Sequence, residues 1–154
     1  MRSVRIVPAT YDHAREAAEA MRDADAAELL AATGLSPLDG LERALDVSER
    51  AWAGLIDGEV AALWGVQPVT LVGQAAYVWC LTTTVVDRFP LTFAKASIQA
   101  MRDLRDDYPV LIGDVDDRYG ASCRWLAWLG GLVGAPRAAG PFAQPFRQFS
   151  FGRA

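Results

Sequence analysis

Residues 76–131 decide the fold of this chain, and they read AYVWCLTTTVVDRFPLTFAKASIQAMRDLRDDYPVLIGDVDDRYGASCRWLAWLGG. The stretch contains two extended runs, each followed by a helical pattern: Ala76–Val86, Phe93–Tyr108, Val110–Asp114 and Ser122–Leu129. This order predicts a βαβα unit with neighbouring parallel strands. A ligand site in such a unit lies at the carboxyl ends of the strands, so we expect any site at the turns Thr84–Arg88 and Asp114–Tyr119.

The rest of the chain adds strands and helices on both sides of this unit. The predicted elements are strand Val4–Val7, one long or two abutting helices over Tyr11–Ala32, helix Pro37–Asp46, strands Ser48–Ile56 and Glu59–Val66, and strand Phe146–Phe151. Asp57-Gly58 is a hairpin signal, Leu132 starts a further strand, and residues 137–145 read as a hairpin loop. The order β-α-α-β-β-β-α-β-α-β-β predicts an α+β (α/β) fold, with a mixed central sheet of six to seven strands flanked by about four helices. Residues 1–154 form a single domain in this interpretation.

Composition and charge narrow the classes of function. The formal net charge is −4, and with one lysine and scattered arginines the chain offers no clustered cations for nucleic acid, so no direct nucleic-acid binding is predicted. No apolar run is long enough to span a membrane, so no membrane partner is expected. The two cysteines, Cys80 and Cys123, lie far apart in apolar segments and are predicted to be buried free thiols.

Two segments resemble the GNAT (Gcn5-related N-acetyltransferase) superfamily. IDGEVAALWGV at residues 56–66 resembles its β2–β3 hairpin, and DVDDRYGASCRWLAWLGG at residues 114–131 resembles its passage from a strand into a helix that ends at glycine. Within the superfamily, the chain is most similar to GNAT-like internal or tail-associated virion proteins of short-tailed bacteriophages. The residues that carry this likeness are GLSPLDGLERALDVSERAWAGLIDGEVAALWGV (34–66), YVWCLTT (77–83), RYGASCRWLAWLGGLVGAP (118–136) and FRQFSF (146–151).

The chain departs from the GNAT enzymes at the turn that holds acetyl-CoA. The resemblance implies a turn of the type Gln/Arg-x-x-Gly-x-Gly/Ala, whose glycines let backbone amides approach the pyrophosphate. This chain has VDRFPLT at residues 86–92, without a glycine. Pro90 removes an amide donor, Phe89 adds bulk and Asp87 adds a repulsive charge, which leaves Arg88 as a single phosphate contact.

The expected catalytic positions differ as well. GNAT enzymes commonly place an asparagine before the second helix of this unit and a tyrosine on it as general acid. Here Tyr119 takes the asparagine position, and Leu126 or Trp125 takes the tyrosine position. Leucine and tryptophan side chains cannot supply that proton.

Two functions follow from the resemblance and its departures. The first is a non-enzymatic structural or assembly protein of a phage virion, made in the bacterial host cytoplasm, with a degenerate acetyl-CoA site and no cofactor. Its partners would be portal, tail or internal proteins, and it would be present in multiple copies. The alternative is an active N-acetyltransferase that uses acetyl-CoA on an amine. In that case Glu59, Asp114 and Tyr119 are the catalytic candidates, and Leu81, Thr84, Val85, Val86 and Arg88 would bind the cofactor.

Several other residues have more ordinary interpretations. His13 lies in the first turn of a helix, and we expect a surface or capping role. Asp114, Asp116 and Asp117 are expected to form a solvated loop, with Asp117 as a helix cap, rather than a metal site or a general base. Trp125 and Trp128 cannot both point inward, so one of them is a candidate anchor for a partner.

Overall fold

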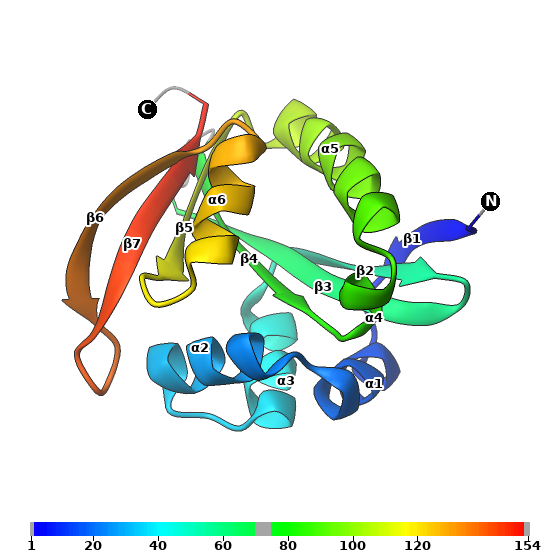
Figure 1. Cartoon of the computed structure of the whole chain (residues 1–154), viewed down its shortest axis with the longest axis horizontal. Helices are drawn as coiled ribbons and strands as arrows, with labels where there is room; N and C mark the ends of the chain where they lie inside the picture. Colours follow the sequence, from blue (N-terminus) through cyan, green and yellow to red (C-terminus); the bar gives the residue numbers. More distant parts are fainter. Residues whose placement is uncertain (1, 70–74, 153–154) are drawn as a thin grey trace.

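The computed structural model describes residues 2–69 and 75–152. They form one seven-stranded sheet with helices on both faces (Figure 1). The strands are β1 Val4–Pro8, β2 Arg50–Ile56, β3 Glu59–Pro68, β4 Ala75–Thr82, β5 Val110–Asp116, β6 Leu132–Ala139 and β7 Gln144–Phe151. The helices are α1 Tyr11–Ala20, α2 Asp23–Thr33, α3 Pro37–Val47, α4 Val85–Arg88, α5 Pro90–Asp107 and α6 Gly120–Trp128. The predicted α+β class and mixed sheet are confirmed, with six helices among these residues in place of about four.

The sheet is a meander joined to a second, shorter group of strands. Its order is β1-β2-β3-β4-β5-β7-β6, and among the described strands β4 and β5 run parallel while the other neighbours are antiparallel. Helices α1, α2 and α3 cover one face and α5 and α6 the other (Figure 1). The described residues form three buried clusters: one around Leu41, Leu63 and Leu81, one around Leu111 and Phe149, and a smaller one that includes Ile56. Burial of these apolar side chains on both faces holds the layers together.

The N-terminal helical region is two helices rather than one. Met21 and Arg22 between them have extended backbones, because Met21 forms a β-bridge with Thr83 and the Arg22 N–H donates to the Thr82 carbonyl at 3.3 Å. The start of α1 confirms the capping role of His13. Thr10 Oγ1 accepts from the His13 N–H, and His13 Nδ1 accepts from the Thr10 N–H, which makes a reciprocal cap.

The prediction that the third long strand runs to Val86 is wrong. Strand β4 ends at Thr82, and residues 85–88 form the short helix α4. The Thr83 hydroxyl donates to the Val60 carbonyl at 2.7 Å and accepts from the Val85 N–H at 3.2 Å, and Thr84 adopts a helical backbone. A threonine side chain that bonds nearby backbone groups turns the chain in spite of the β-branched sequence.

The predicted loop over residues 137–145 is also wrong at both ends. Strands β6 and β7 extend to Ala139 and from Gln144, which leaves a short turn with Gly140 at φ +75°. Pro136 is tolerated because β6 is an edge strand and has a free side. Within the described part of the chain, no helix is both long and apolar enough to cross a membrane.

Candidate ligand cleft between strands β4 and β5

Strands β4 and β5 pair only at their beginnings. Their register runs through Ala75–Val110, Ala76–Leu111 and Tyr77–Ile112, and no pairing joins the remainder of the two strands. Strand β5 instead stays paired with β7 as far as Asp116 opposite Phe146. The two parallel strands therefore separate toward their carboxyl ends, where ligands bind in sheets of this kind.

The separation opens a cleft of about 510 Å³. Its walls come from β4, β5, α2, α3, α6 and the beginning of α5. The polar residues of this cleft that carry the chemistry are Asp25, Glu28, Tyr77, Thr82 and Asp114. A cavity of this size with a few convergent polar groups is the usual form of a small-molecule site.

Glu28 is a carboxyl group of this cleft whose pKa is raised into the neutral range. Its Oε2 accepts from the Asp116 N–H at 3.2 Å, which ties α2 to the carboxyl end of β5. Burial, and the nearby charges of Asp25, Asp116 and Asp114, raise the pKa of Glu28 to about 7. A carboxyl group with this pKa can accept or release a proton near neutral pH.

Asp25 lies on the same helix, one turn before Glu28. Its Oδ2 accepts from the Thr82 hydroxyl at 2.7 Å, at the end of β4. Burial raises the pKa of Asp25, and the hydrogen bonds from Thr82 partly oppose that shift. Helix α2 thus presents two carboxyl groups to the cleft, one bonded to each of the separating strands.

Tyr77 and Asp114 form the third polar contact of the cleft. The Tyr77 hydroxyl donates to Asp114 Oδ2 at 3.3 Å. Burial and the Asp114 charge raise the pKa of Tyr77, so the phenol stays protonated at neutral pH. The other oxygen, Asp114 Oδ1, is buried without a hydrogen-bond donor in the described structure, and Arg137 Nη2 lies 3.8 Å away as an ion pair.

Cys80 also lines the cleft but is not suited to nucleophilic catalysis. Burial raises the pKa of its thiol to about 12, with further contributions from Asp25 and Glu28. The reactive form of cysteine is the thiolate, which is scarce at neutral pH under these conditions. Both cysteines are free thiols, but by accessible surface each is only partly buried, whereas the sequence predicts buried thiols.

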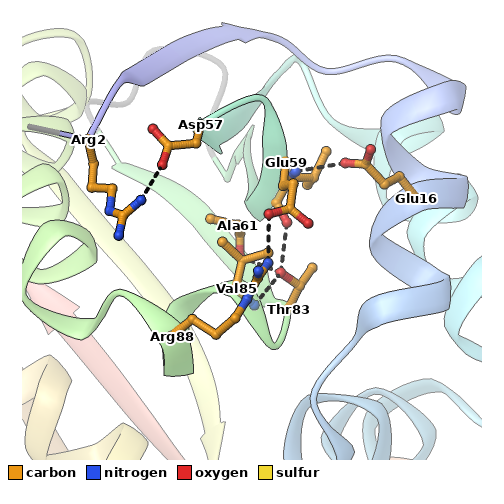
Figure 2. Close-up of polar contacts among 9 residues, drawn as sticks. Arg2, Glu16, Asp57, Glu59, Ala61, Thr83, Val85 and Arg88 are labelled. Carbon is orange, nitrogen blue, oxygen red and sulfur yellow. Dashed lines mark hydrogen bonds and ion pairs between the residues drawn. The ribbon is translucent and has the colours of Figure 1, made fainter.

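Most backbone amides of the turn after β4 already donate hydrogen bonds within the protein. Thr84 donates to the Ala20 carbonyl, Val85 to the Thr83 hydroxyl, and Val86, Asp87 and Phe89 to carbonyls within the turn, all at 2.9–3.2 Å. Arg88 is occupied too, because its Nη2 lies 2.7 Å from Glu59 Oε2 (Figure 2). Five amides of the region expected to meet a pyrophosphate are therefore already bonded within the protein, whereas the first turn of α5 has no side-chain cap.

The structure separates the candidate catalytic residues. Asp114 lines the cleft, whereas Glu59 lies on the β2–β3 hairpin, half exposed, and pairs with Arg88 (Figure 2). Tyr119 is the residue before α6, and its ring contacts the Arg118 guanidinium. Tyr119 is not among the residues that line the cleft.

The candidate cofactor-binding residues are divided in the same way. Leu81 and Val86 line the cleft. Val85 is buried in a small cluster with Ile56 and Ala61 and does not line the cleft. Thr84 is exposed, and Arg88 is held by Glu59. Only part of this set therefore faces the cavity.

The expected solvated acidic loop is wrong for Asp116. Its side chain is fully buried and is held by the Arg118 guanidinium at 2.6–3.1 Å. Asp117 pairs with Arg147 and does not cap α6, whose preceding residue is Tyr119. Across residues 2–69 and 75–152, no three His, Cys, Asp or Glu side chains gather as a metal site.

Sequence reasoning missed Asp25, Glu28 and Tyr77. Asp25 and Glu28 are three residues apart, so they share one face of a helix, and they interrupt an otherwise apolar run of alanine and leucine. That spacing is the one signal in the sequence. The opening to which this face points is created by the separation of two strands far along the chain.

No protein-family model and no curated protein matches the sequence. Solved structures of acetyltransferases do superpose on this fold. A ribosomal-protein-alanine N-acetyltransferase from Brucella melitensis superposes with a TM-score of 0.71 at 14% identity, covering 97% of this chain and 99% of that one. The ribosomal L7/L12 alpha-N-protein acetyltransferase RimL, in complex with coenzyme A, gives 0.71 at 9% identity, covering 96% and 93%.

A third similar structure is a chimera of the spermidine N-acetyltransferase SpeG from Vibrio cholerae and hSSAT. It superposes with a TM-score of 0.68 at 11% identity, covering 96% of this chain and 94% of that chain. At such low identity these matches establish shared architecture and not shared activity. The chain has the GNAT acetyltransferase fold.

Proposed function

We propose that this chain is a GNAT-fold protein without acetyl-CoA chemistry, which serves as a structural or assembly part of a phage particle. The observation that carries the proposal is the internal pairing of the turn between β4 and α5. The amides of Thr84, Val85, Val86, Asp87 and Phe89 all donate to groups of the protein. Pro90 has no amide to offer.

Charge at the same turn adds to this obstacle. Asp87 is exposed there, and Arg88 is engaged by Glu59. A pyrophosphate placed at the turn would meet the Asp87 carboxylate, which Arg22 neutralises only in part at 3.5 Å, while Arg88 is held by Glu59. Binding would also have to break several backbone hydrogen bonds, each of which costs free energy when its partner is left buried and unpaired.

Two observations support a role in a phage particle: the sequence resemblance to virion proteins and the apolar side chains exposed on the surface. Several large apolar side chains are exposed in this monomer, among them Trp128, Leu91 and Leu132. Exposed tryptophans are frequent anchors of protein interfaces. Portal, tail or internal virion proteins are the partners that the resemblance implies, and the chain would be present in multiple copies.

Calorimetric titration of the full chain with coenzyme A and acetyl-CoA tests the loss of the cofactor. We expect no binding at micromolar concentrations, and micromolar affinity for either compound would overturn the proposal. Asp87→Asn is the matched variant, because it removes the charge and leaves the paired amides in place. If Asp87→Asn binds coenzyme A and the wild type does not, the charge of Asp87 and not the pairing of the amides prevents binding. The amide pairing would then no longer support the proposal.

Mass spectrometry of purified particles tests the assembly role. Particles of a phage that encodes this chain are expected to contain it in several copies. Its presence in infected cells together with its absence from purified particles would contradict the proposal. Particles made without its gene should show a defect in assembly or genome delivery while other virion proteins are expressed normally.

A second candidate function, N-acyl transfer to an amine, is favoured by the cleft itself. The cleft holds Glu28 with a pKa of about 7, suited to take a proton from an attacking ammonium group. Asp114 lies in the same cavity, and its Oδ1, which has no hydrogen-bond donor and only a 3.8 Å ion pair with Arg137, could accept from the amine. Helix α5 begins without a side-chain cap, so its first turn still offers backbone amides to an anion.

Release of free thiol from acetyl-CoA, measured over a panel of primary amines, tests this second function. If it is correct, Glu28→Gln should lower kcat/KM at least tenfold, because the proton acceptor is removed. Glu19→Gln on the exposed side of α1 is the matched control and should leave the rate unchanged. Absence of thioester cleavage with every amine would exclude the second function and leave the first in place.

A further inference from the structure

Strand β1 forms one edge of the sheet, and no strand of the described residues pairs with its outer side (Figure 1). The Ser3 carbonyl accepts from the Asp57 N–H at 2.8 Å, so Ser3 and every second residue after it turn their backbone groups toward β2. The residues between them turn theirs outward. The outer edge therefore offers the amides of Val4 and Ile6, and the carbonyls of both residues and of Pro8, for further hydrogen bonds.

The side chains of β1 that face α5 are apolar and partly uncovered. Val4 is 41% exposed and Ile6 is 44% exposed. With Ala96 and Ala100 of α5 they line an apolar hollow of about 90 Å³ between the helix and the sheet, which we call the β1–α5 hollow. Val4 and Ile6 are the exposed members of this lining, so its apolar surface continues to the edge of the sheet.

The opposite face of β1 carries a positive charge. Val7 packs against the buried cluster that includes Ala14 of α1, and Arg5 shares this face because side chains two apart on a strand lie on one side. Arg5 is exposed and forms no ion pair with the residues that the structure describes, whereas Arg2 pairs with Asp57. A strand added beside β1 would therefore meet apolar groups on one face and an arginine on the other.

The other edge of the sheet is less suited to accept a strand. Strand β6 carries Pro136 in its middle, and its pairing with β7 shifts register between Val133 and Pro136. A proline and an irregular register interrupt the regular series of outward amides and carbonyls that a new strand needs. In β1, the single proline stands at the end of the strand.

Charge also argues against a second copy of this chain as the added strand. Two copies of β1 paired antiparallel about Arg5 would place their Arg5 side chains directly opposite each other. Pairing about Ile6 would set Arg5 opposite Val7 of the other copy and leave the two arginines diagonal neighbours on one face. Like charges in such positions destabilise a strand pair, whereas an acidic residue beside Arg5 would stabilise it.

We propose that the outer edge of β1 binds an extended segment of another protein by strand addition, with apolar side chains toward the β1–α5 hollow and acidic side chains beside Arg5. Backbone hydrogen bonds hold such a segment, and the two faces select its alternating sequence. The proposal deepens the assembly role and rests on it only for the existence of a partner. Peptide titrations can fail while the chain is found in particles, and the reverse, so the two failures are distinguishable.

Calorimetry of the full chain at pH 7 with three blocked hexapeptides tests the site. The probe has the sequence VEVEVE, and the two controls are VKVKVK, with the opposite charge, and SESESE, without the apolar face. We expect VEVEVE to bind at least tenfold more tightly than either control. Equal affinity for VEVEVE and one of the controls would overturn the proposal, as would the absence of VEVEVE binding.

Hydrogen exchange followed by NMR tests whether the peptide adds as a strand. Saturation with VEVEVE should slow exchange of the Val4 and Ile6 amides at least tenfold, because both would then donate to the peptide. The amides of Arg5 and Val7 face β2 already and serve as the internal reference. Binding of VEVEVE without protection of the Val4 and Ile6 amides would contradict strand addition.

Variants of β1 test the selection of the partner. Arg5→Glu should weaken VEVEVE binding at least tenfold and make VKVKVK the tighter ligand. Arg124→Glu, the same change at an exposed position of α6, is the control and should leave both affinities unchanged. Thermal melts establish that the variants fold, and Arg5→Gln replaces Arg5→Glu if the latter does not. A folded Arg5 variant with the wild-type preference would overturn the charge selection.

Ile6→Pro tests the edge itself, since it removes an outward amide and leaves the amides that face β2 in place. It should weaken VEVEVE binding at least tenfold. Sedimentation equilibrium of the wild type and of Ile6→Pro distinguishes a second copy from a foreign segment. A wild-type dimer that Ile6→Pro dissociates would assign the edge to a second copy and overturn the proposal.

Discussion

Glu28 Oε2 lies 3.2 Å from the backbone nitrogen of Asp116, so a carboxyl group on α2 reaches across to the carboxyl end of β5. Burial raises the pKa of this group from 4.5 to about 7 in the folded protein. The folded state therefore favours the protonated form. Its stabilising effect is complete below pH 4.5 and is lost as the pH rises through about 7.

The first prediction concerns the pH dependence of stability. Ionised Glu28 should cost about 3 kcal/mol of the free energy of unfolding at pH 8 relative to pH 4.5, on the order of magnitude set by the pKa shift. Glu28→Gln should match the wild type at low pH and exceed it at pH 8, as measured by urea denaturation. Glu19→Gln, on an exposed position of α1, should follow the wild type at both pH values. Parallel curves for Glu28→Gln and the wild type would show that Glu28 does not titrate in this range.

The second prediction concerns Gly113, which follows Ile112, the last residue of β5 that pairs with β4. A Cβ at this position would lie 2.7 Å from the Val78 carbonyl oxygen and 2.4 Å from Phe149 Cζ. Gly113→Ala should lower the free energy of unfolding by about 1–3 kcal/mol, because β4 or Phe149 must move. The measurement is again urea denaturation. Gly120→Ala is the control, since its Cβ would meet only the flexible end of Arg124. Equal stability of the two variants would mean that the start of the cleft accommodates a side chain.

The third prediction concerns the Thr83 hydroxyl, which joins β3 to the turn after β4. It donates to the Val60 carbonyl and accepts from the Val85 N–H, as Figure 2 shows around Thr83 and Val85. Thr83→Val keeps the shape and leaves both buried backbone groups without this partner, at a cost of about 1–3 kcal/mol each. Thr84→Val should change the free energy of unfolding by less, because that side chain is exposed and makes no capping bond. The comparison fails if both variants lose the same stability in thermal denaturation.

Much of the fold follows from local sequence patterns. The Asp57-Gly58 hairpin, the Thr10–His13 cap and the Gly34 helix end are each specified by residues that lie next to one another. The sequence-based predictions fail where contacts between residues far apart in the sequence determine the local backbone. Residues 83–86 are β-branched and read as strand, yet the Val60 carbonyl engages Thr83 and the chain turns into α4. The cleft is the extreme case, because Glu28 meets Asp116 across 88 positions of sequence.

The fourth prediction concerns Trp128, whose side chain is 59% exposed at the end of α6. Together with Leu129 it borders a groove against α5 that also involves Ile98, Met101 and Pro109. This placement agrees with the expectation that one of the two tryptophans of this helix faces outward. Trp128→Ala should change the free energy of unfolding by no more than about 0.5 kcal/mol, because the side chain is largely solvated.

The same substitution should impair incorporation of the chain into phage particles if Trp128 anchors a partner, because exposed tryptophans that become buried in an interface contribute about 2 kcal/mol or more to binding. The measurement is the ratio of this chain to the major capsid protein in particles purified from cells that express Trp128→Ala. Phe142→Ala, also exposed but located in the β6–β7 turn, is the matched control. A normal ratio for a stably folded Trp128→Ala would exclude the groove between α5 and α6 as the partner surface. A loss for both variants would point instead to a partner that covers the β6–β7 turn as well.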